Sequence, residues 1–290
     1  MKKHNFHQNK ISAFVAAYHE DKLIERCLKS LQGVVDEIIV IHDGLCQDKT
    51  LEIARKYTDL IFEMPENKGV GDSHNIFAFN QCSFNWVLVI DADEYLSEEL
   101  RTNISELVKN NNVSAYSFIW PMWDGQKYIS KNWPYKKILF QKKDVGLIDK
   151  FHHGIIVKGL TKEVPFIIHH QPLYNNYSKE VFDKKAIRWS RLQARDHLAT
   201  IESREIYNFD IEPLKREQQI KDIFYRFPFL CAVISSFTVL LDVPRRPYIL
   251  FQKGLWLKCK IMFKYTYNVA KEVGILKNKM NRDFIKKIYD

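Results

Sequence analysis

The sequence lacks several features that would place it in a specialised class of proteins. Its cysteines are five in number and include no CxxC pair: Cys27, Cys46, Cys82, Cys231 and Cys259. This pattern argues against a disulfide framework and a cysteine zinc site, and it is typical of a reducing compartment. The first residues show no secretory signal core, and no apolar run reaches the roughly 20 residues needed to cross a bilayer. We therefore expect a cytoplasmic protein.

Acidic residues are scarce near the C-terminal end. Residues 244–290 contain 12 Lys and Arg but three Asp and Glu, so this segment carries the whole net charge of +9. Large apolar and aromatic residues alternate with these basic residues, and the uncharged run Phe227–Leu241 precedes them. Aromatic and basic residues on one helix favour the headgroup region of a membrane. The pattern predicts peripheral contact with the cytoplasmic face of a membrane. An apolar run packed on the body, beside an ordinary solvated basic face, is the alternative.

The first hundred residues alternate between strand and helix patterns. Apolar runs predict strands at Ile11–Ala17, Glu37–Ile41, Leu60–Phe62 and Trp86–Ile90, with helical spacing between them. Such alternation implies right-handed crossovers and an α/β fold with a mostly parallel central sheet flanked by helices. Shorter mixed pieces follow from Val113 to Ile168, and then helices at Lys179–Thr200 and Leu214–Phe224.

We expect two domains. The first is expected at residues 1–212 and has two halves, the regular strand–helix half at 1–112 and the mixed half at 113–212. Residues 213–290 form a helical, basic C-terminal extension.

Asp91-Ala92-Asp93 is the strongest chemical signal. Two carboxylates two residues apart, directly after a buried strand, are suited to hold a divalent cation and the diphosphate that it bridges. In parallel sheets ligands bind at this carboxyl end of the strands. The alternative is that these acids cap the helix that follows.

Four segments together resemble the family 2 glycosyltransferases, which have the GT-A fold. They are Phe14-Val-Ala-Ala-Tyr-His-Glu-Asp21, His42-Asp-Gly-Leu-Cys-Gln-Asp-Lys-Thr50, Asn67-Lys-Gly-Val-Gly-Asp-Ser-His-Asn75 and Val87-Leu-Val-Ile-Asp-Ala-Asp-Glu94. The resemblance covers about the first third of the chain. Within it, His19 stands where the family usually has Asn, His42 replaces the first Asp of a turn, and His74 stands where Arg is common.

The resemblance implies a metal-dependent glycosyltransferase that works with inversion, similar to bacterial lipopolysaccharide-core sugar transferases. Its donor would be a nucleotide-diphosphate sugar, most directly a UDP-sugar, and its acceptor a saccharide or a lipid-linked saccharide. Residues 1–212 would then be the catalytic GT-A domain, with the nucleotide-sugar half at 1–112 and the acceptor half at 113–212. The implied nucleotide-sugar contacts are Ala17, Glu20, Asp43, Lys68, Gly69 and Asp91. The implied Mn²⁺ or Mg²⁺ ligands are Asp91, Asp93 and a later histidine, His169 or its neighbour His170.

Simpler roles remain open for several of these residues. Asp43 is also a typical turn former before glycine, and Glu20 also suits a solvated helix start. Lys68 and Gly69 also suit a mobile surface loop. An inverting transfer needs a base for the acceptor hydroxyl, and His153 and Asp124 are the candidates.

Two alternative functions would each require sequence features different from those of a glycosyltransferase. A sugar-nucleotidyltransferase would carry a phosphate loop rich in glycine and basic residues, but residues 16–21 contain no Gly and no Arg. A non-enzymatic basic nucleic-acid-binding protein would explain the C-terminal charge but not acids at strand ends. We therefore expect no nucleic-acid partner.

Overall fold

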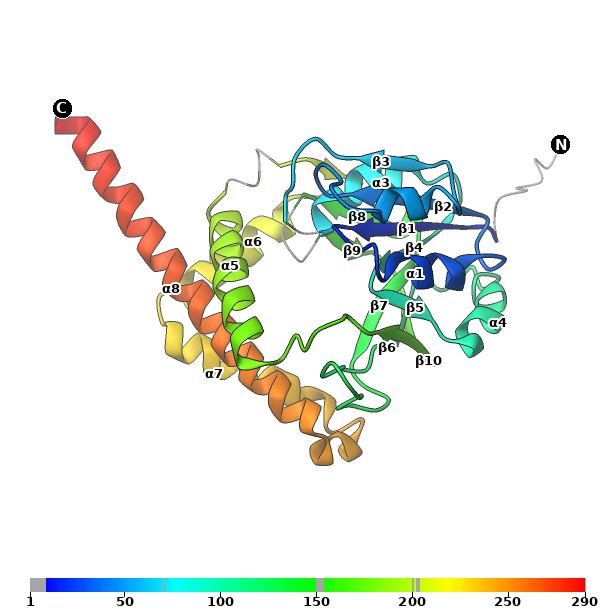
Figure 1. Ribbon diagram of the computed structural model, residues 1–290. Coiled ribbons are helices and arrows are strands. Elements are labelled where there is room, and N and C mark those ends of the chain that lie inside the picture. Colours follow the sequence, from blue (N-terminus) through cyan, green and yellow to red (C-terminus); the bar gives the residue numbers. More distant parts are fainter. Residues whose placement is uncertain (1–8, 70, 150–153, 200, 202–203, 290) are drawn as a thin grey trace. The chain divides into compact units, whose positions relative to one another are not determined.

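The computed structural model describes residues 9–69, 71–149, 154–199, 201 and 204–289. The chain divides into two compact units (Figure 1). Unit 1 comprises Met1–Tyr174 and Glu205–Phe209, and unit 2 comprises Asn175–Arg204 and Asp210–Asp290. This division differs from the expected boundary at 212/213, because the helix beginning at Lys179 packs with the C-terminal helix.

Unit 1 contains a large mixed sheet with helices on it. Its elements in chain order are β1 (Ile11–Ala17), α1 (Ile24–Leu31), β2 (Glu37–His42), α2 (Thr50–Ala54), β3 (Ile61–Glu63), η1 (Gly71–His74), α3 (Asn75–Gln81), β4 (Trp86–Asp91), β5 (Glu94–Leu96), α4 (Glu98–Leu107), β6 (Ala115–Ile119), β7 (Tyr135–Gln141), η2 (Lys142–Asp144), β8 (Val145–Ile148), β9 (Ile155–Val157), β10 (Thr161–His170) and β11 (Ile206–Tyr207). The large sheet has the order β3-β2-β1-β4-β7-β6-β10-β5, and β11-β8-β9 form a smaller sheet.

The first four strands of the large sheet are parallel, as the sequence predicted. β1 pairs with β2 and β4 in parallel register, so the carboxyl ends of all three lie at one edge. Antiparallel pairing begins where β7 joins β4, and β5 joins β10 antiparallel at the other side. This pairing brings residues from the second half of unit 1 to the end of β4.

Alternate residues of the central strands feed two cores. Ala13 and Val15 of β1 lie in one apolar cluster with residues of α1 and α4, whereas Phe14 lies in another with Phe79 of α3. This is the period-two alternation of a sheet covered on both faces.

The turn after β4 leads into a strand rather than into a helix. Asp91-Ala92-Asp93 is followed by β5, and the N-cap of α4 is Ser97, whose hydroxyl accepts a hydrogen bond from the Leu100 amide at 3.2 Å. Since Ser97 supplies the cap, the helix-capping alternative for Asp91 and Asp93 is wrong.

Unit 2 is helical. Its elements are α5 (Lys179–Leu198), α6 (Glu212–Tyr225), α7 (Pro228–Thr238), η4 (Val239–Asp242), η5 (Pro247–Phe251) and α8 (Lys253–Tyr289). Ala194 of α5 packs with Val269 and Val273 of α8. About three turns nearer the start of α5, the Asp183 carboxylate pairs with the Lys264 ammonium of α8. The apolar run and the basic segment of the sequence are thus α7 and α8.

Candidate active site

Five charged or titratable side chains meet at the end of β4. They are Asp91, Asp93, Glu94, Lys136 and His170, called here the carboxylate cluster. Asp91 ends β4, Glu94 begins β5, Lys136 lies on β7 and His170 ends β10. The cluster therefore depends on the β7–β4 and β10–β5 pairings.

Lys136 links two of the carboxylates. Its ammonium donates to Asp91 Oδ2 at 2.8 Å and to Glu94 Oε1 at 2.6 Å. Burial alone would lower the pKa of Lys136, but these two carboxylates raise it well above its ordinary value. Lys136 is consequently a permanent positive charge between the acids.

Glu94 is the buried member of the cluster. It is fully buried, and besides Lys136 it accepts hydrogen bonds from the Trp120 indole at 2.5 Å and from the Asp91 amide at 3.1 Å. Burial raises the pKa of this carboxyl. Its contacts on both sides fix the turn that presents Asp91 and Asp93.

His170, rather than His169, lies beside the DxD carboxylates. His170 Nε2 is 3.1 Å from Asp93 Oδ2. Burial works to raise the pKa of Asp93, but the His170 contact lowers it and leaves the net pKa below its ordinary value. His169 Nδ1 instead lies 2.6 Å from the Tyr128 hydroxyl. Neighbouring residues of a strand point to opposite faces, which separates the two imidazoles.

Asp43 makes its contacts within the protein. Its side chain is buried, and its two oxygens accept the amides of Lys68 and Gly69, each at 2.8 Å. His74 Nε2 lies 2.8 Å from Asp43 Oδ1. Although burial would raise it, these contacts hold the pKa of Asp43 below its ordinary value. Asp43 thus fixes the loop that was expected to approach the donor.

Gly44 makes that close approach possible. It has φ 88°, and a Cβ at this position would lie 2.9 Å from the Asn67 Cβ. A side chain here would meet both backbone strain and a steric clash.

The two remaining nucleotide candidates lie at the same sheet edge. The Ala17 carbonyl accepts the Asp43 amide at 2.9 Å, and the Glu20 amide donates to the Thr50 hydroxyl at 2.8 Å. Tyr18 between them is 48% exposed, so its ring is available for stacking.

Of the two candidate bases, the structure describes Asp124 but not His153, which lies outside the described residues. Asp124 holds its own turn, because its Oδ1 accepts the amides of Gln126 and Lys127 at 3.0 and 2.9 Å. These bonds lower the pKa of Asp124, which makes it a weaker base.

Sequence reasoning missed Lys136, Glu94 as a cluster member, and Trp120. Lys136 is 45 residues from Asp91 along the chain, and no local pattern marks it. Glu94 is the last residue of the family-like segment that ends in the DxD, and its position directly after Asp93 could have indicated that it belongs to the cluster.

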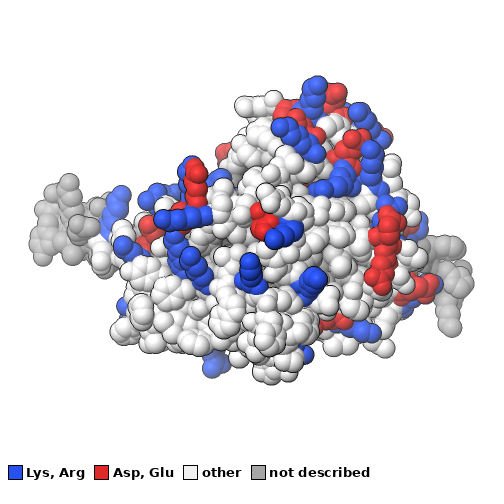
Figure 2. Space-filling view, turned by 60° about the horizontal axis from the view of Figure 1, so that its bottom comes forward, with Lys and Arg blue, Asp and Glu red and all other residues white. Residues whose placement is uncertain are grey.

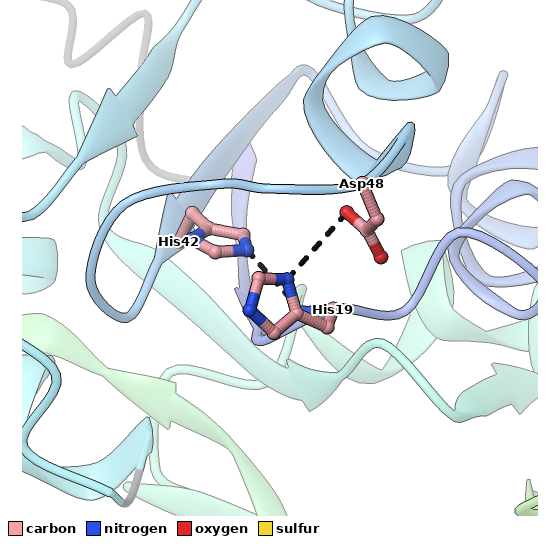
Figure 3. Close-up of side chains that lie close together, drawn as sticks. All are labelled: His19, His42 and Asp48. Atoms are coloured by element: carbon pink, nitrogen blue, oxygen red, sulfur yellow. Dashed lines mark hydrogen bonds and ion pairs between the residues drawn. The ribbon is translucent and has the colours of Figure 1, made fainter.

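A third group lies at the ends of β1 and β2. His19, His42 and Asp48 each offer one ligand atom, and these three atoms lie within 4.8 Å of one another (Figure 3). Asp48 accepts the Thr50 amide at 2.9 Å, and burial is outweighed by its Thr50 contacts, which lower its pKa to about 2.

The family model and the relatives that match this sequence are described as glycosyltransferases. The sequence model described as Glycosyl transferase family 2 matches residues 12–176. An uncharacterized glycosyltransferase of Rickettsia bellii is 37% identical over 107 residues, which cover 37% of this chain and 35% of that protein. The lipopolysaccharide core biosynthesis glycosyltransferase LpsC of Rhizobium meliloti is 29% identical over 159 residues, which cover 51% of this chain and 58% of LpsC.

The chain thus spans about a third of the length of the Rickettsia relative and somewhat over half of LpsC. Among solved structures, S. aureus TarS 1–349 in complex with UDP-GlcNAc aligns over 93% of this chain and 92% of its own. Its identity to this chain is 13% and its TM-score 0.47.

Proposed function

Because the chain belongs to glycosyl transferase family 2, we propose that it transfers a sugar from a nucleotide-diphosphate donor to an acceptor hydroxyl. The observation that carries the proposal is the carboxylate cluster at the end of β4, which lies where ligands bind in parallel sheets. Acids at this edge can meet a diphosphate only with cations between them. Lys136 supplies one positive charge, and a divalent ion would supply the rest.

Asp91 and Asp93 are the residues that would hold Mn²⁺ or Mg²⁺, with His170 as a third ligand. They suit such an ion, since the Asp91 side chain is 53% exposed and His170 Nε2 lies 3.1 Å from Asp93 Oδ2. Carboxylate oxygens suit both ions, whereas imidazole favours Mn²⁺. When bound, the ion would neutralise charge on the leaving diphosphate.

Other members of the cluster would position these groups. Glu94, held by Trp120, sets the direction of the turn, and His170 holds the Asp93 carboxylate in its ionised form. Lys136 keeps Asp91 from facing Glu94 as an unbalanced negative pair. The site is in this way prepared before the donor arrives.

We further propose a UDP-sugar donor and an inverting displacement. Asp43 would act through the loop at Lys68 and Gly69, and Tyr18 would stack on the nucleobase. The base for the acceptor hydroxyl stays a prediction, with His153 preferred because Asp124 is bound into its turn.

The direct test is donor turnover without a known acceptor. Purified protein is incubated with Mn²⁺ and a panel of nucleotide-sugars, and slow donor hydrolysis is scored. Hydrolysis of one donor supports the proposal and names the nucleotide. No turnover of any donor, with intact folding and no nucleoside-diphosphate binding by calorimetry, would contradict it.

The acceptor is proposed to be a saccharide on a lipid, presented at the cytoplasmic face of a membrane. The similarity to LpsC supports this acceptor class. Unit 2 supports the location, because its helices expose large apolar side chains that a water-facing surface rarely gathers. The most exposed are Phe251 at 91%, Leu241 at 73% and Phe229 at 67%.

Basic residues accompany these apolar side chains. Arg226, Arg245 and Lys253 are exposed on the same stretch of chain. Figure 2 shows a wide uncharged area on one face with lysine and arginine side chains beside it. Each cation near an anionic surface contributes on the order of 1 kcal/mol.

Within the described residues no single helix is long and apolar enough to cross a membrane. The bent pair Glu212–Tyr225 and Pro228–Asp242, with 119° between its halves, passes that test by length and composition only.

Sedimentation with lipid vesicles tests the location. The full chain should pellet with anionic vesicles and remain in solution with neutral ones at moderate salt. Leu241→Ser with Phe251→Ser should weaken this binding, whereas Leu160→Ser, which removes an exposed leucine of unit 1, should not. Protein that stays in the supernatant with anionic vesicles at low salt would favour a soluble acceptor.

A further inference from the structure

The three side chains at the ends of β1 and β2 have no role in the reaction proposed above. His42 ends β2, His19 follows β1, and Asp48 precedes α2. They lie at the same sheet edge as the carboxylate cluster but share no residue with it. Two imidazoles and one carboxylate form the donor set of an open zinc-type site, in which the fourth position takes water or another ligand.

His42 is oriented as a metal ligand would be. Its ring is fully buried, and Nδ1 lies 2.6 Å from the Gly44 carbonyl oxygen. A carbonyl only accepts, so Nδ1 carries the proton and Nε2 presents its lone pair. Metal-binding histidines commonly donate their second N–H to a backbone carbonyl in this way. Nε2 faces the group, and within the described part of the chain it accepts one long hydrogen bond, of 3.3 Å from the His19 amide.

His19 supplies an unsatisfied atom. Its Nδ1 is buried without a hydrogen-bond partner among the described residues, and it lies 3.8 Å from Asp48 Oδ1 (Figure 3). A buried polar atom without a partner costs about 1–3 kcal/mol, so a ligand at this point is favoured. The residue also has φ 52°, an uncommon conformation that sets the ring against His42.

Asp48 is held in place as the third donor. Oδ1 accepts the Thr50 amide at 2.9 Å and the Cys46 thiol at 3.3 Å, and Oδ2 accepts the Asp21 amide at 3.4 Å. These bonds fix the carboxylate without supplying a cation.

From this geometry we propose that His19, His42 and Asp48 bind one transition-metal ion of the zinc type. The three ligand atoms, within 4.8 Å of one another, need to close by about 1 Å to reach metal–ligand bonds of about 2.0–2.2 Å. The site is separate from the divalent-cation site proposed at Asp91 and Asp93. Imidazole nitrogens make it a poor site for Mg²⁺.

The experiment uses the full chain, stripped of metal with chelator and then dialysed against Zn²⁺ or Co²⁺. Bound metal is counted by mass spectrometry, and the visible absorption of Co²⁺ reports a low-coordinate site with nitrogen ligands. His19→Asn is the informative variant, because Asn accepts a positive φ and so keeps the backbone while removing the imidazole. It should weaken Zn²⁺ binding by at least the roughly 100-fold that the loss of a hydrogen-bond partner behind a ligand can already cause.

Three further proteins separate the possible outcomes. Asp48→Asn should also lose the metal, and Asp59→Asn, which removes an exposed carboxylate elsewhere, should keep it. Asp91→Asn with Asp93→Asn should keep Zn²⁺ while losing transfer, which distinguishes this proposal from the proposed function. Wild-type protein that retains no Zn²⁺, or His19→Asn protein that retains it fully, would overturn the site.

Discussion

Two carboxylates at strand ends on either side of β1 differ in how far the protein itself has satisfied them. Asp43, after β2, is 4% exposed and meets two backbone amides and one imidazole. The Asp91 side chain, at the end of β4, is 53% exposed and pairs with Lys136. A satisfied, buried carboxylate holds structure, whereas an open one keeps lone pairs for a ligand. The same residue type at the same sheet edge is thus used up by protein contacts at Asp43 and left half exposed at Asp91.

The largest effect is expected at the open carboxylate. Asp91→Asn should lower transfer about 10³-fold, or about 4 kcal/mol, because under the proposed function it removes a charge that would hold the cation on the diphosphate. Its melting temperature should stay near that of the wild type, since the side chain is half exposed. Radiolabelled sugar transfer and thermal unfolding measure the two quantities. Full wild-type activity in excess EDTA would contradict the metal role.

Lys136 should matter for stability as well as for activity. Lys136→Met leaves Glu94 buried without its cation and should cost about 3 kcal/mol of unfolding free energy. Denaturant unfolding measures this loss. Adding Glu94→Gln should restore most of the stability and none of the activity. If the double variant is as unstable as the single one, the pair is not the cause.

Unlike Asp91, Asp43 should contribute to the stability of the fold. Asp43→Ala removes the acceptor for Lys68 and Gly69 and should cost about 1–3 kcal/mol, shared between unfolding and donor binding. Hydrogen exchange should show the Gly69 amide losing protection, and calorimetry should show weaker nucleoside-diphosphate binding. Unchanged exchange at Gly69 would mean that another contact fixes the loop.

The smallest effect is a pH dependence at Asp48. Its pKa is lowered to about 2 in the folded chain, against about 3.9 when unfolded. A lowered folded pKa stabilises the protein fully above the unfolded value, and this contribution fades as the pH falls from about 4 to about 2. In metal-free buffer at neutral pH, the Asp48→Asn protein should have an unfolding free energy about 1–2 kcal/mol below that of the wild type. The two unfolding free energies should become equal at about pH 2. A constant difference across that range would assign the loss to packing.

Much of the fold could be predicted from short stretches of neighbouring residues. The strands β1, β2 and β4 begin and end within a residue of their predicted positions, because buried parallel strands are continuous apolar runs. The DxD at the end of β4 and the helical, basic C-terminal segment follow from the same patterns. The four segments were sufficient to indicate the family that the sequence model matches at residues 12–176.

Only the tertiary structure determined which side chains contact the carboxylates and histidines of the candidate site. Lys136 reaches Asp91 only because β7 joins β4 antiparallel, and His170 reaches Asp93 only because β10 pairs with β5. Similarly, the proton of His42 is placed by the Gly44 carbonyl, and the amides of the following loop satisfy Asp43. Sequence spacing records the period of a single strand or helix, whereas pairing between distant strands depends on the packing of the whole sheet. For this reason the sequence could name the ligand candidates, His169 and His170 among them. It could not show which of the two histidines lies beside Asp93, nor that Lys136 pairs with Asp91.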